Sequence, residues 1–391
     1  MKKEYLLSII VPTKNRYPYL LQLLELIESF NFEDVEVVIQ DNNENNKPIL
    51  DFFEGLGGKP SNITYEWQKE SIPISLNSDY AILNSHGEYV CFIGDDDGVS
   101  RYIVDCCKWM KNNEVECVVP KGYTYLWPDA IVNAKLRGSL EYIMPSKEMV
   151  VLQTKEVLDV AMNSGMVNRG NLPLLYHGIV KRSTLDKIWA ICNSYFPGAS
   201  PDIANGVALC LVMDKFAITT FPYAYSGKSQ TLGGGAYKMK HQATLNFKSL
   251  SFLPKNIDEI WNPKVPKIWA ACSIWCESAI EAMYNMKRED LIDKINYEAL
   301  YVEFVTYFYH YRRMAYNLTS SRLNLFIGSS FRIISRYTNA FLRLFKRKIF
   351  KRYNNGPYMM QLGLDSIIEA NKFIESICAY KFLIVLLLCS Y

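Results

Sequence analysis

Three consecutive aspartates, Asp95, Asp96 and Asp97, follow an apolar run at 89–94. The run predicts a short strand buried on both faces, which would deliver like charges side by side at its carboxyl end. Such carboxylates attract a cation, and Mg²⁺ or Mn²⁺ often binds through one or two carboxylates while substrate phosphates complete the shell. The triplet therefore predicts a metal and phosphate site, although acidic turns of Asp and Gly are also common.

Alternating patterns in the first hundred residues indicate the elements that must position the triplet. Continuous apolar runs predict strands at 6–11, 35–40 and 63–67 and a further strand from 87. Apolar residues at helical spacing predict helices at 18–30, 49–55 and 75–85. This alternation predicts an α/β fold with a mostly parallel sheet wound by helices, and such sheets bind ligands at the carboxyl ends of their strands.

Polar residues follow the first two predicted strands and should converge with the triplet. Thr13, Asn15 and Arg16 follow the first strand, and Asp41 follows the second. Asp41 could accept hydrogen bonds from a base or a ribose, whereas an Asx turn or a helix cap explains it equally well.

The 391 residues have room for two domains, or for one domain with a large extension. Their net charge of +3 hides an asymmetry, because 304–356 contains no Asp or Glu. The same segment carries Arg312, Arg313, Arg322, Arg332, Arg336, Arg343, Lys346, Arg347, Lys348, Lys351 and Arg352. It predicts a positive surface that meets an anionic partner.

Ten cysteines are scattered through apolar or helical stretches without zinc spacing, which predicts buried thiols in a reducing compartment. The apolar stretch at 5–11 is short and runs into Pro12, so it predicts a strand rather than a signal peptide. The apolar stretch at 382–389 is too short to span a bilayer. We therefore expect no transmembrane helix.

Four motifs, in this order, resemble those of family 2 glycosyltransferases with the GT-A fold. They occupy 8–16, 38–42, 77–90 and 95–97. The resemblance covers roughly residues 6–225 and implies a GT-A domain at 1–235, followed by a helical C-terminal region at 236–391. It also implies a nucleotide-sugar donor, usually a uridine diphosphate (UDP) sugar, and a divalent metal, Mn²⁺ or Mg²⁺.

The resemblance assigns roles to residues of this sequence. The residues expected at the donor are Pro12, Thr13, Asn15, Arg16, Asp41, Asn77, Asp95 and Asp96. Asp95 and Asp97 would be the paired acids of the Asp-x-Asp motif and the metal ligands. Because Gly94 stands between the apolar run and the first acid, Asp96 remains an alternative to Asp97 at the metal.

Inverting transfer also needs a carboxylate that takes the proton from the acceptor hydroxyl. Asp202 is the candidate, because it precedes a helical run at 207–213 and the family places its catalytic acid at the start of a helix in this part of the chain. A helix cap is the competing explanation. Weaker rivals, in stretches that predict exposed helices or loops, are Glu141, Glu148, Glu156, Asp159 and Asp186.

Two further residues have open roles. His177 lies at the edge of an apolar strand and could face the acceptor or the metal, although a satisfied buried histidine is more frequent. Lys228 lies in a predicted flexible loop at 225–230 that precedes three glycines. The loop could close Lys228 over the donor diphosphate or be a plain linker, and it lacks the spacing of a Walker motif.

From about residue 257 onward, apolar spacing predicts helices at 266–286, 290–311, 323–351 and 364–388. The stretch 331–352 interleaves aromatic and aliphatic residues with Lys and Arg, which is typical of an amphipathic helix on an anionic membrane surface. The solvated face of a helical bundle is the alternative. Nucleic acid is disfavoured, because no binding motif accompanies the charge.

The sequence thus predicts an inverting, metal-dependent glycosyltransferase of bacterial surface polysaccharide (O-antigen or capsule) biosynthesis. Its acceptor would be a saccharide, with an undecaprenyl-diphosphate-linked saccharide preferred, and the protein would be cytoplasmic and peripheral at the inner face of the cell membrane. The alternative is a non-catalytic nucleotide-sugar-binding scaffold of a polysaccharide-synthesis complex. A nucleotidyltransferase ranks third, because the loop after the first strand contains no glycine.

Overall fold

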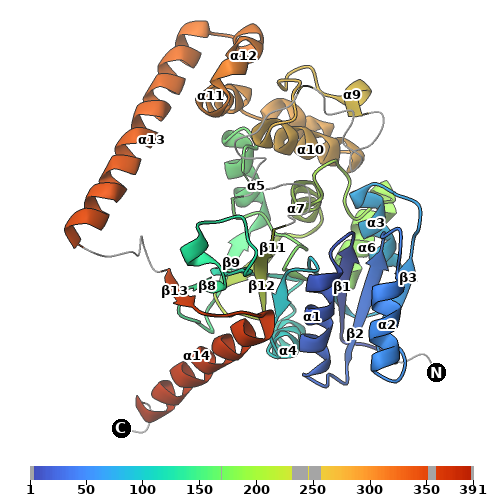
Figure 1. Cartoon of the computed structure of the whole chain (residues 1–391). Coiled ribbons are helices and arrows are strands. Elements are labelled where there is room, and N and C mark those ends of the chain that lie inside the picture. Colours follow the sequence, from blue (N-terminus) through green and yellow to red (C-terminus); the bar gives the residue numbers. More distant parts are fainter. Residues whose placement is uncertain (1–3, 169, 231–244, 246–256, 351–357, 389–391) are drawn as a thin grey trace.

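The structure is a computed structural model that describes residues 4–168, 170–230, 245, 257–350 and 358–388, without the side chains of 339–350 and 380–388. A layered sheet domain forms the lower part of the molecule in Figure 1, and helices α10, α11 and α12 lie above it.

Within the described residues, the larger sheet has eight strands in the order β3-β2-β1-β4-β10-β6-β11-β9. The parallel half contains β1 (Leu7–Thr13), β2 (Val35–Asp41), β3 (Ile63–Trp67) and β4 (Tyr89–Phe92). The other half contains β6 (Cys117–Pro120), β9 (Met149–Gln153), β10 (Ile179–Lys181) and β11 (Lys215–Thr219). There β6 and β11 are parallel, whereas β10 and β9 run antiparallel to their neighbours. The predicted, mostly parallel α/β sheet is confirmed.

Helices cover both faces of this sheet, because residues along each strand point alternately to two cores. In β1, Leu7, Ile9 and Val11 face one core and Ile10 faces the other. The first core is covered by α1 (Tyr17–Glu28), α2 (Lys47–Gly55) and α4 (Ile103–Asn112). The second is covered by α3 (Ile74–Leu83), α6 (Arg182–Cys192) and α7 (Pro201–Val212).

A second sheet contains five strands within the described residues, in the order β13-β8-β7-β12-β5. Its strands are β5 (Gly98–Val99), β7 (Tyr123–Leu126), β8 (Ser139–Tyr142), β12 (Ala224–Lys228) and β13 (Met359–Leu362). The expectation that everything after residue 257 is helical is therefore wrong at β13. This short segment pairs with the edge of β8, and its side chains alternate in exposure as an edge strand requires.

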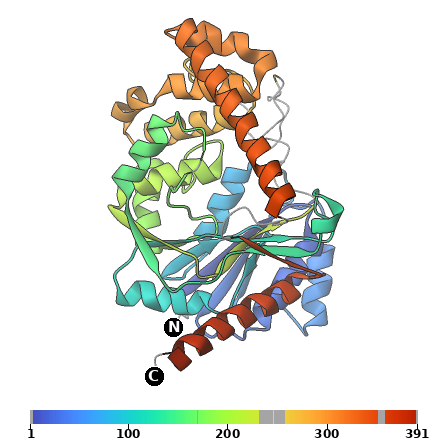
Figure 2. The same ribbon diagram turned by 90° about the vertical axis from the view of Figure 1, so that its left-hand side faces the viewer.

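The chain then returns to the sheet domain through α14 (Ile367–Leu388), which lies below the sheets in Figures 1 and 2. Ile367 and Ile374 of α14 share a core with Tyr19 of α1 and Tyr125 of β7. The C-terminal part of the chain is thus divided between an upper helical layer and a helix packed against the N-terminal domain.

The upper layer confirms the predicted helical region. It contains α9 (Ile257–Ile260), α10 (Ala271–Asn285), α11 (Tyr297–Tyr307), α12 (Arg312–Leu318) and α13 (Arg322–Phe350). Its core also includes α5 (Thr154–Asn163) and α7, so this layer is joined to the sheet domain. The domain boundary near residue 235 stays a prediction, because 231–244 and 246–256 lie outside the described residues. Over the described ranges, no helix has the length and apolarity needed to cross a bilayer.

The described cysteines are all free thiols, and all but Cys192 are buried. They behave as small apolar residues of the cores, as the sequence predicted.

Candidate functional site

Asp95 lies just beyond the carboxyl end of β4 and is held by the loop that follows β1. Asn15 adopts a positive φ of 60°, which turns the chain after β1 so that Arg16 points back at the triplet. Arg16 Nε lies 2.9 Å from Asp95 Oδ1, and Thr13 Oγ1 donates to Asp95 Oδ2 at 2.7 Å. Two residues predicted at the donor are thus in direct contact with the triplet. Pro12 lies in the same strand, β1, as its penultimate residue.

Asp96 is held by Arg16 and by the end of β12. Its Oδ2 is paired with Arg16 Nη2 and accepts a hydrogen bond from Ser229 Oγ at 2.7 Å. Its backbone carbonyl accepts from Trp127 Nε1 at 2.8 Å. Ser229 and Trp127 were not identified from the sequence, because they come from distant segments that meet only in the second sheet.

Asp97 is fully buried, and protein donors occupy both of its carboxylate oxygens. Oδ1 accepts from Gly227 N at 2.7 Å, and Oδ2 accepts from Gly94 N at 2.6 Å. His177 Nε2 lies 2.8 Å from the same Oδ2. His177 has a φ of 63°, and its backbone N–H donates to Phe92 O, so a left-handed turn aims the imidazole at the triplet.

The surroundings of the three aspartates shift their pKa values in different directions. Burial raises the pKa of Asp95 to about 7, although Arg16 opposes the shift. Burial and the neighbouring Asp97 raise the pKa of Asp96. Burial also disfavours charge on Asp97, but His177, together with hydrogen bonds from Gly227 and Tyr176, outweighs burial and lowers the pKa of Asp97 below its usual value. Charge on Asp95 and Asp96 would therefore be stabilised by a further cation or donor group.

The residues do not fit a divalent ion held by Asp95 and Asp97. All four oxygens of these two side chains already accept hydrogen bonds or ion pairs from the protein. Over the described ranges, no group of three or more His, Cys, Asp and Glu side chains could hold a metal. Asp96 Oδ1 is different, because no described side chain or backbone group donates to it. Asp96, the alternative to Asp97, is the aspartate with an open oxygen.

Asp41 forms the Asx turn that the sequence left open as one explanation. Its Oδ1 accepts from Asn43 N at 2.9 Å, and its Oδ2 accepts from the hydroxyls of Tyr17 and Tyr65. Nearby, buried Asn77 donates from Nδ2 to Gln40 O at 3.4 Å, while its Oδ1 accepts from no described group. Base contact by Asp41 stays a prediction, and Asn77 offers an acceptor beside the end of β2.

Asp202 lies in the first turn of α7, while Ser200 is the N-cap residue. The electrostatic neighbours of Tyr176 connect Asp202 to the triplet. Burial raises the pKa of the Tyr176 phenol, and the charges of Asp97, Asp96 and Asp202 raise it further. Asp202 is thus near enough to act electrostatically on Tyr176, the phenol on which Asp97 and Asp96 also act.

The prediction of a flexible loop at 225–230 is wrong for its first four residues, because Ala224–Lys228 form β12. The strand passes so close to the triplet that a Cβ on Gly227 would lie 1.6 Å from Asp96 O. Only glycine fits there. Gly227 is therefore the residue of the sequence that could have indicated a strand close to the site. The Lys228 side chain is exposed at the end of β12, and the glycines at 233–235 lie outside the described residues.

The rival carboxylates are placed elsewhere. Glu141 was predicted in an exposed helix or loop but lies in β8, where it pairs across to Met360 of β13. Glu148 precedes β9, Glu156 and Asp159 lie on α5, and Asp186 lies on α6. None of these four has a described contact with the triplet.

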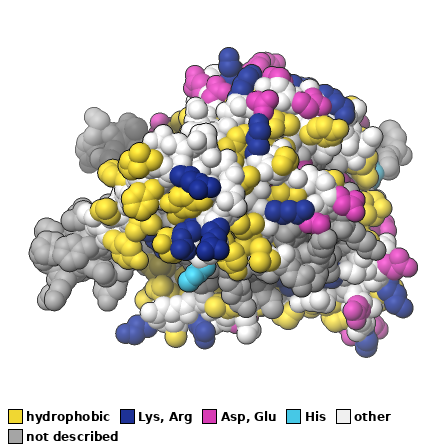
Figure 3. Space-filling view, turned by 90° about the horizontal axis from the view of Figure 1, so that it is seen from above, with side chains coloured by type: hydrophobic (Ala, Val, Ile, Leu, Met, Phe, Trp, Pro, Cys, Tyr) yellow, Lys and Arg dark blue, Asp and Glu magenta, His cyan; other side chains and the backbone are white. Residues whose placement is uncertain are grey.

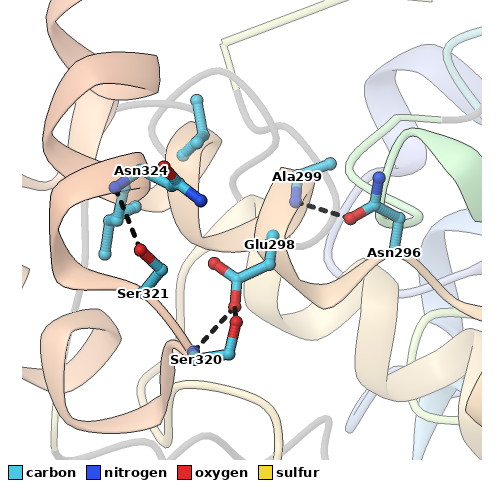
Figure 4. A pocket seen from close by; sticks show the side chains of 8 residues that line it. Asn296, Glu298, Ala299, Ser320, Ser321 and Asn324 are labelled. Carbon is cyan, nitrogen blue, oxygen red and sulfur yellow. Dashed lines mark hydrogen bonds between the residues drawn. The ribbon is translucent and has the colours of Figure 1, made fainter.

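A pocket of about 240 Å³ between α11 and α13 has a structural explanation. In Figure 4, Asn296 and Glu298 both point to backbone groups at the starts of helices. Asn296 Oδ1 accepts from Ala299 N at 3.1 Å, and Glu298 Oε1 accepts from Ser320 N at 2.8 Å. The bond from Asn296 caps α11 itself, the bond from Glu298 joins α11 to the segment before α13, and no residue of the triplet lines the pocket.

Residues 8–170 match the family model described as glycosyl transferase family 2. This match confirms the resemblance seen in the motifs, and the N-terminal part of the chain is a family 2 glycosyltransferase domain. The matched segment contains the triplet, Arg16 and Asp41, but ends before Tyr176 and Asp202.

Solved structures with a similar chain course include S. aureus TarS. TarS 1–349 is 14% identical, with 83% of this chain and 78% of that chain covered and a TM-score of 0.45. Its complex with UDP-GlcNAc is 14% identical, with 92% and 97% covered and a TM-score of 0.46. A search of curated proteins finds no match. The family assignment therefore rests on the match to residues 8–170.

Proposed function

We propose that this chain is an inverting glycosyltransferase that moves a sugar from a nucleotide sugar, preferably a UDP-sugar, to a saccharide acceptor. The process would be bacterial surface polysaccharide biosynthesis, such as that of O-antigen or capsule. The observation that carries the proposal is a family 2 domain that brings Asp95–Asp97 together with Arg16 and Thr13, while Asp202 in the first turn of α7 acts on Tyr176 as Asp96 and Asp97 do.

The donor would bind at the carboxyl ends of β1, β2 and β4, where Thr13, Asp41 and the triplet lie. Asn77 Oδ1 would accept a hydrogen bond from the nucleotide, and exposed Lys228 would supply positive charge to the leaving diphosphate. Asn15 would line the pocket through the turn that it forms beside Asn43.

Asp202 would take the proton from the acceptor hydroxyl as its oxygen attacks the anomeric carbon on the face opposite the diphosphate. The C–O bond to the diphosphate breaks as the new glycosidic bond forms, so the configuration at that carbon inverts. Position supports this role, because the first turn of α7 contains a carboxylate whose charge acts on Tyr176, as the charges of Asp97 and Asp96 do.

Metal dependence stays a prediction. A divalent ion, if required, would supply charge to offset that of the departing diphosphate. The oxygens of Asp95 and Asp97 already accept hydrogen bonds or ion pairs from the protein, so no step of the proposed reaction is assigned to such an ion.

A donor panel tests the proposal directly. Purified protein is incubated with UDP-glucose, UDP-galactose, UDP-N-acetylglucosamine and UDP-N-acetylgalactosamine, with Mn²⁺, with Mg²⁺ or with EDTA, and UDP release is measured. We expect release from one donor above the others, with water as the acceptor. Binding of UDP without release from any donor would support the scaffold alternative, and absence of both would contradict a nucleotide-sugar function.

We also propose that α13 holds the protein against an anionic membrane, which would bring the domain to a lipid-linked acceptor. Six apolar side chains of α13 recur at helical spacing and are between 56% and 74% exposed. They form the α13 stripe, which consists of Leu323, Phe326, Ile327, Phe331, Ile334 and Tyr337. Figure 3 shows hydrophobic and Lys or Arg side chains gathered side by side on the face that contains these upper helices.

The rest of α13 explains why this stripe faces outward. Leu325 is buried against the helical core, and a Cβ on Gly328 would lie 3.0 Å from Val302 of α11, so the opposite side of α13 is packed. Arg322 and Arg336 flank the stripe, and 304–356 contains no carboxylate to repel anionic lipid. The predicted segment 331–352 has described side chains only as far as residue 338.

Vesicle co-sedimentation separates this proposal from a protein interface. Wild-type protein should bind phosphatidylglycerol-containing vesicles more than pure phosphatidylcholine vesicles, and Phe331→Ser with Ile334→Ser should reduce binding at least about fivefold, since each buried apolar side chain is worth roughly 1.5–3 kcal/mol. Val160→Ser, at an exposed apolar position on α5, is the matched control. Unchanged vesicle binding, or dimers that dissociate in the double variant, would contradict the membrane proposal.

A further inference from the structure

The segment 193–200, which leads from α6 into α7 and the candidate base, is called the base loop here. Its residues Tyr195, Phe196, Pro197 and Ala199 are buried, so their backbone polar groups must find partners inside the protein. The N-cap residue of α7, Ser200, makes no side-chain capping bond of its own. Partners from other elements therefore decide where α7 begins.

Three side chains on one face of α10 provide those partners. Ser278, Glu281 and Asn285 are spaced by three and four residues, which places them along one side of the helix. Ser278 Oγ accepts from Ser200 N at 2.7 Å, and Glu281 Oε2 accepts from Ala199 N at 2.6 Å. Asn285 Nδ2 donates to Pro197 O at 3.0 Å.

The approach of α10 to the base loop is close. A Cβ on Gly198 would lie 2.8 Å from Ser278 O and 3.1 Å from Glu281 Oε2, so the loop lies directly against the helix. The start of the loop is fixed from the other side. Asp79 of α3 accepts from Ser194 Oγ and Tyr195 N, both at 2.8 Å.

We propose that Glu281 and Ser278 are positioning residues for Asp202. Through Ala199 and Ser200 they fix the two backbone amides that directly precede Pro201 and Asp202, and they thereby set the direction in which the first turn of α7 presents its carboxylate. Helix α10 of the C-terminal region thereby supports Asp202, which is the acceptor half of the site. The residues proposed to bind the donor, which are the donor half, belong to the sheet domain. This inference rests on the proposed role of Asp202 as the base.

The test uses the full-length protein and the donor from the four-sugar panel that gives the most UDP release. Glu281→Ala removes the acceptor for Ala199 N, whereas Glu281→Gln keeps a carbonyl oxygen in its place. We expect Glu281→Ala to lower kcat about 10- to 100-fold with donor KM changed less than about twofold, and Glu281→Gln to retain most activity. Ser278→Ala should act in the same direction more weakly. Asp293→Ala, which removes an exposed ion pair with Lys264, is the control.

Two readouts distinguish positioning from general support of the fold. Hydrogen exchange at the Ala199 amide should accelerate in Glu281→Ala and stay protected in Glu281→Gln. In an Asp202→Asn background, Glu281→Ala should cause no further loss of rate, because the residue acts through Asp202.

The outcomes separate this inference from the proposed function. Loss of activity in Asp202→Asn but not in Glu281→Ala would overturn the positioning role and leave the base assignment intact. Full activity of Asp202→Asn would overturn both. Additive losses in the double variant would show that Glu281 only supports the fold. If Glu281→Ala does not fold, Ser278→Ala answers the same question by the same readouts.

Discussion

The donor half and the acceptor half of the proposed site are held by different parts of the chain. Asp95, Asp96 and Asp97 accept hydrogen bonds and ion pairs from residues between 13 and 229, all close to the two sheets. The base loop takes its partners from α10 and α3. Donor geometry thus belongs to the sheet domain, whereas base geometry depends on how the helical layer packs. Substitutions should therefore separate donor binding from transfer.

The largest expected effect is on transfer alone. Asp202→Asn keeps the shape of the side chain but removes the proton acceptor, so turnover should fall about 10²- to 10⁴-fold. Donor affinity measured by calorimetry should stay within about threefold, because the triplet and Arg16 are unchanged. Asp159→Asn, an exposed carboxylate on α5, is the control. Undiminished turnover would remove Asp202 from the mechanism and with it the division of the site into two halves.

A change in the donor half should instead destabilise the fold. Asp97→Asn removes a buried charge that is paired with His177, and breaking such a pair costs about 3–5 kcal/mol. Urea denaturation should show this loss in the free energy of unfolding. Asp290→Asn breaks the exposed pair with Arg288 and should leave the free energy of unfolding almost unchanged, because solvent screens this pair.

The same variants show which aspartate would hold a metal. UDP binding is measured by calorimetry with Mn²⁺ and with EDTA. If the ion is held through Asp96, then Asp96→Asn abolishes the difference between the two conditions and Asp97→Asn retains it. The opposite result would assign Asp97 as a metal ligand, as the Asp-x-Asp resemblance implied.

A smaller effect is expected from the strand that supports the triplet. In Gly227→Ala the new methyl group meets Asp96 O, so β12 must shift, at a cost of about 1–3 kcal/mol for an overpacked site. Affinity for UDP should fall with it, because Ser229 and Gly227 hold Asp96 and Asp97. Gly55→Ala, where no atom lies within 4 Å of the new group, is the control. A variant with wild-type stability and UDP affinity would show that β12 does not fix the triplet.

The sheet domain could be predicted from the sequence because its signals are local. Apolar runs and turns located β1 to β4, and the order of the motifs placed Thr13, Arg16 and the triplet at one edge. The partners of the triplet could not be found in this way. Ser229, Trp127 and Tyr176 reach it from segments more than 30 residues away, through strand pairing that leaves no local pattern.

The second sheet could not be predicted from the sequence for the same reason. β13 has four residues, alternates weakly and depends on pairing with β8, which is more than 200 residues earlier in the chain. The base loop was equally hidden, because Ser278, Glu281 and Asn285 look like ordinary helix residues until α10 is packed against 197–200. Its position before a predicted helix identified Asp202 as a candidate, but the residues that hold the base loop could not be predicted.

The last expected effect is the pH dependence of the stability of the helical layer. Burial raises the pKa of Glu277 to about 8 and that of Glu281 to about 7. Glu277 Oε1 accepts from Asn262 N at 2.9 Å, while Oε2 has no partner among the described groups, which agrees with a neutral carboxyl group. Between the usual pKa of about 4.3 and these raised values, the folded state binds more protons than the unfolded state.

The free energy of unfolding should therefore fall as the pH rises from about 5 to about 8, by an amount on the order of 1–3 kcal/mol. The double variant Glu277→Gln with Glu281→Gln keeps the acceptor oxygens and should show a flatter profile in urea denaturation at pH 5.5 and pH 8.5. A profile as steep as that of the wild type would assign the dependence to other groups, such as Asp79, whose pKa burial raises to about 6. Because Glu281 also holds the base loop, a flatter profile with retained turnover would show that the hydrogen bond to Ala199, rather than the charge of Glu281, is what the acceptor half requires.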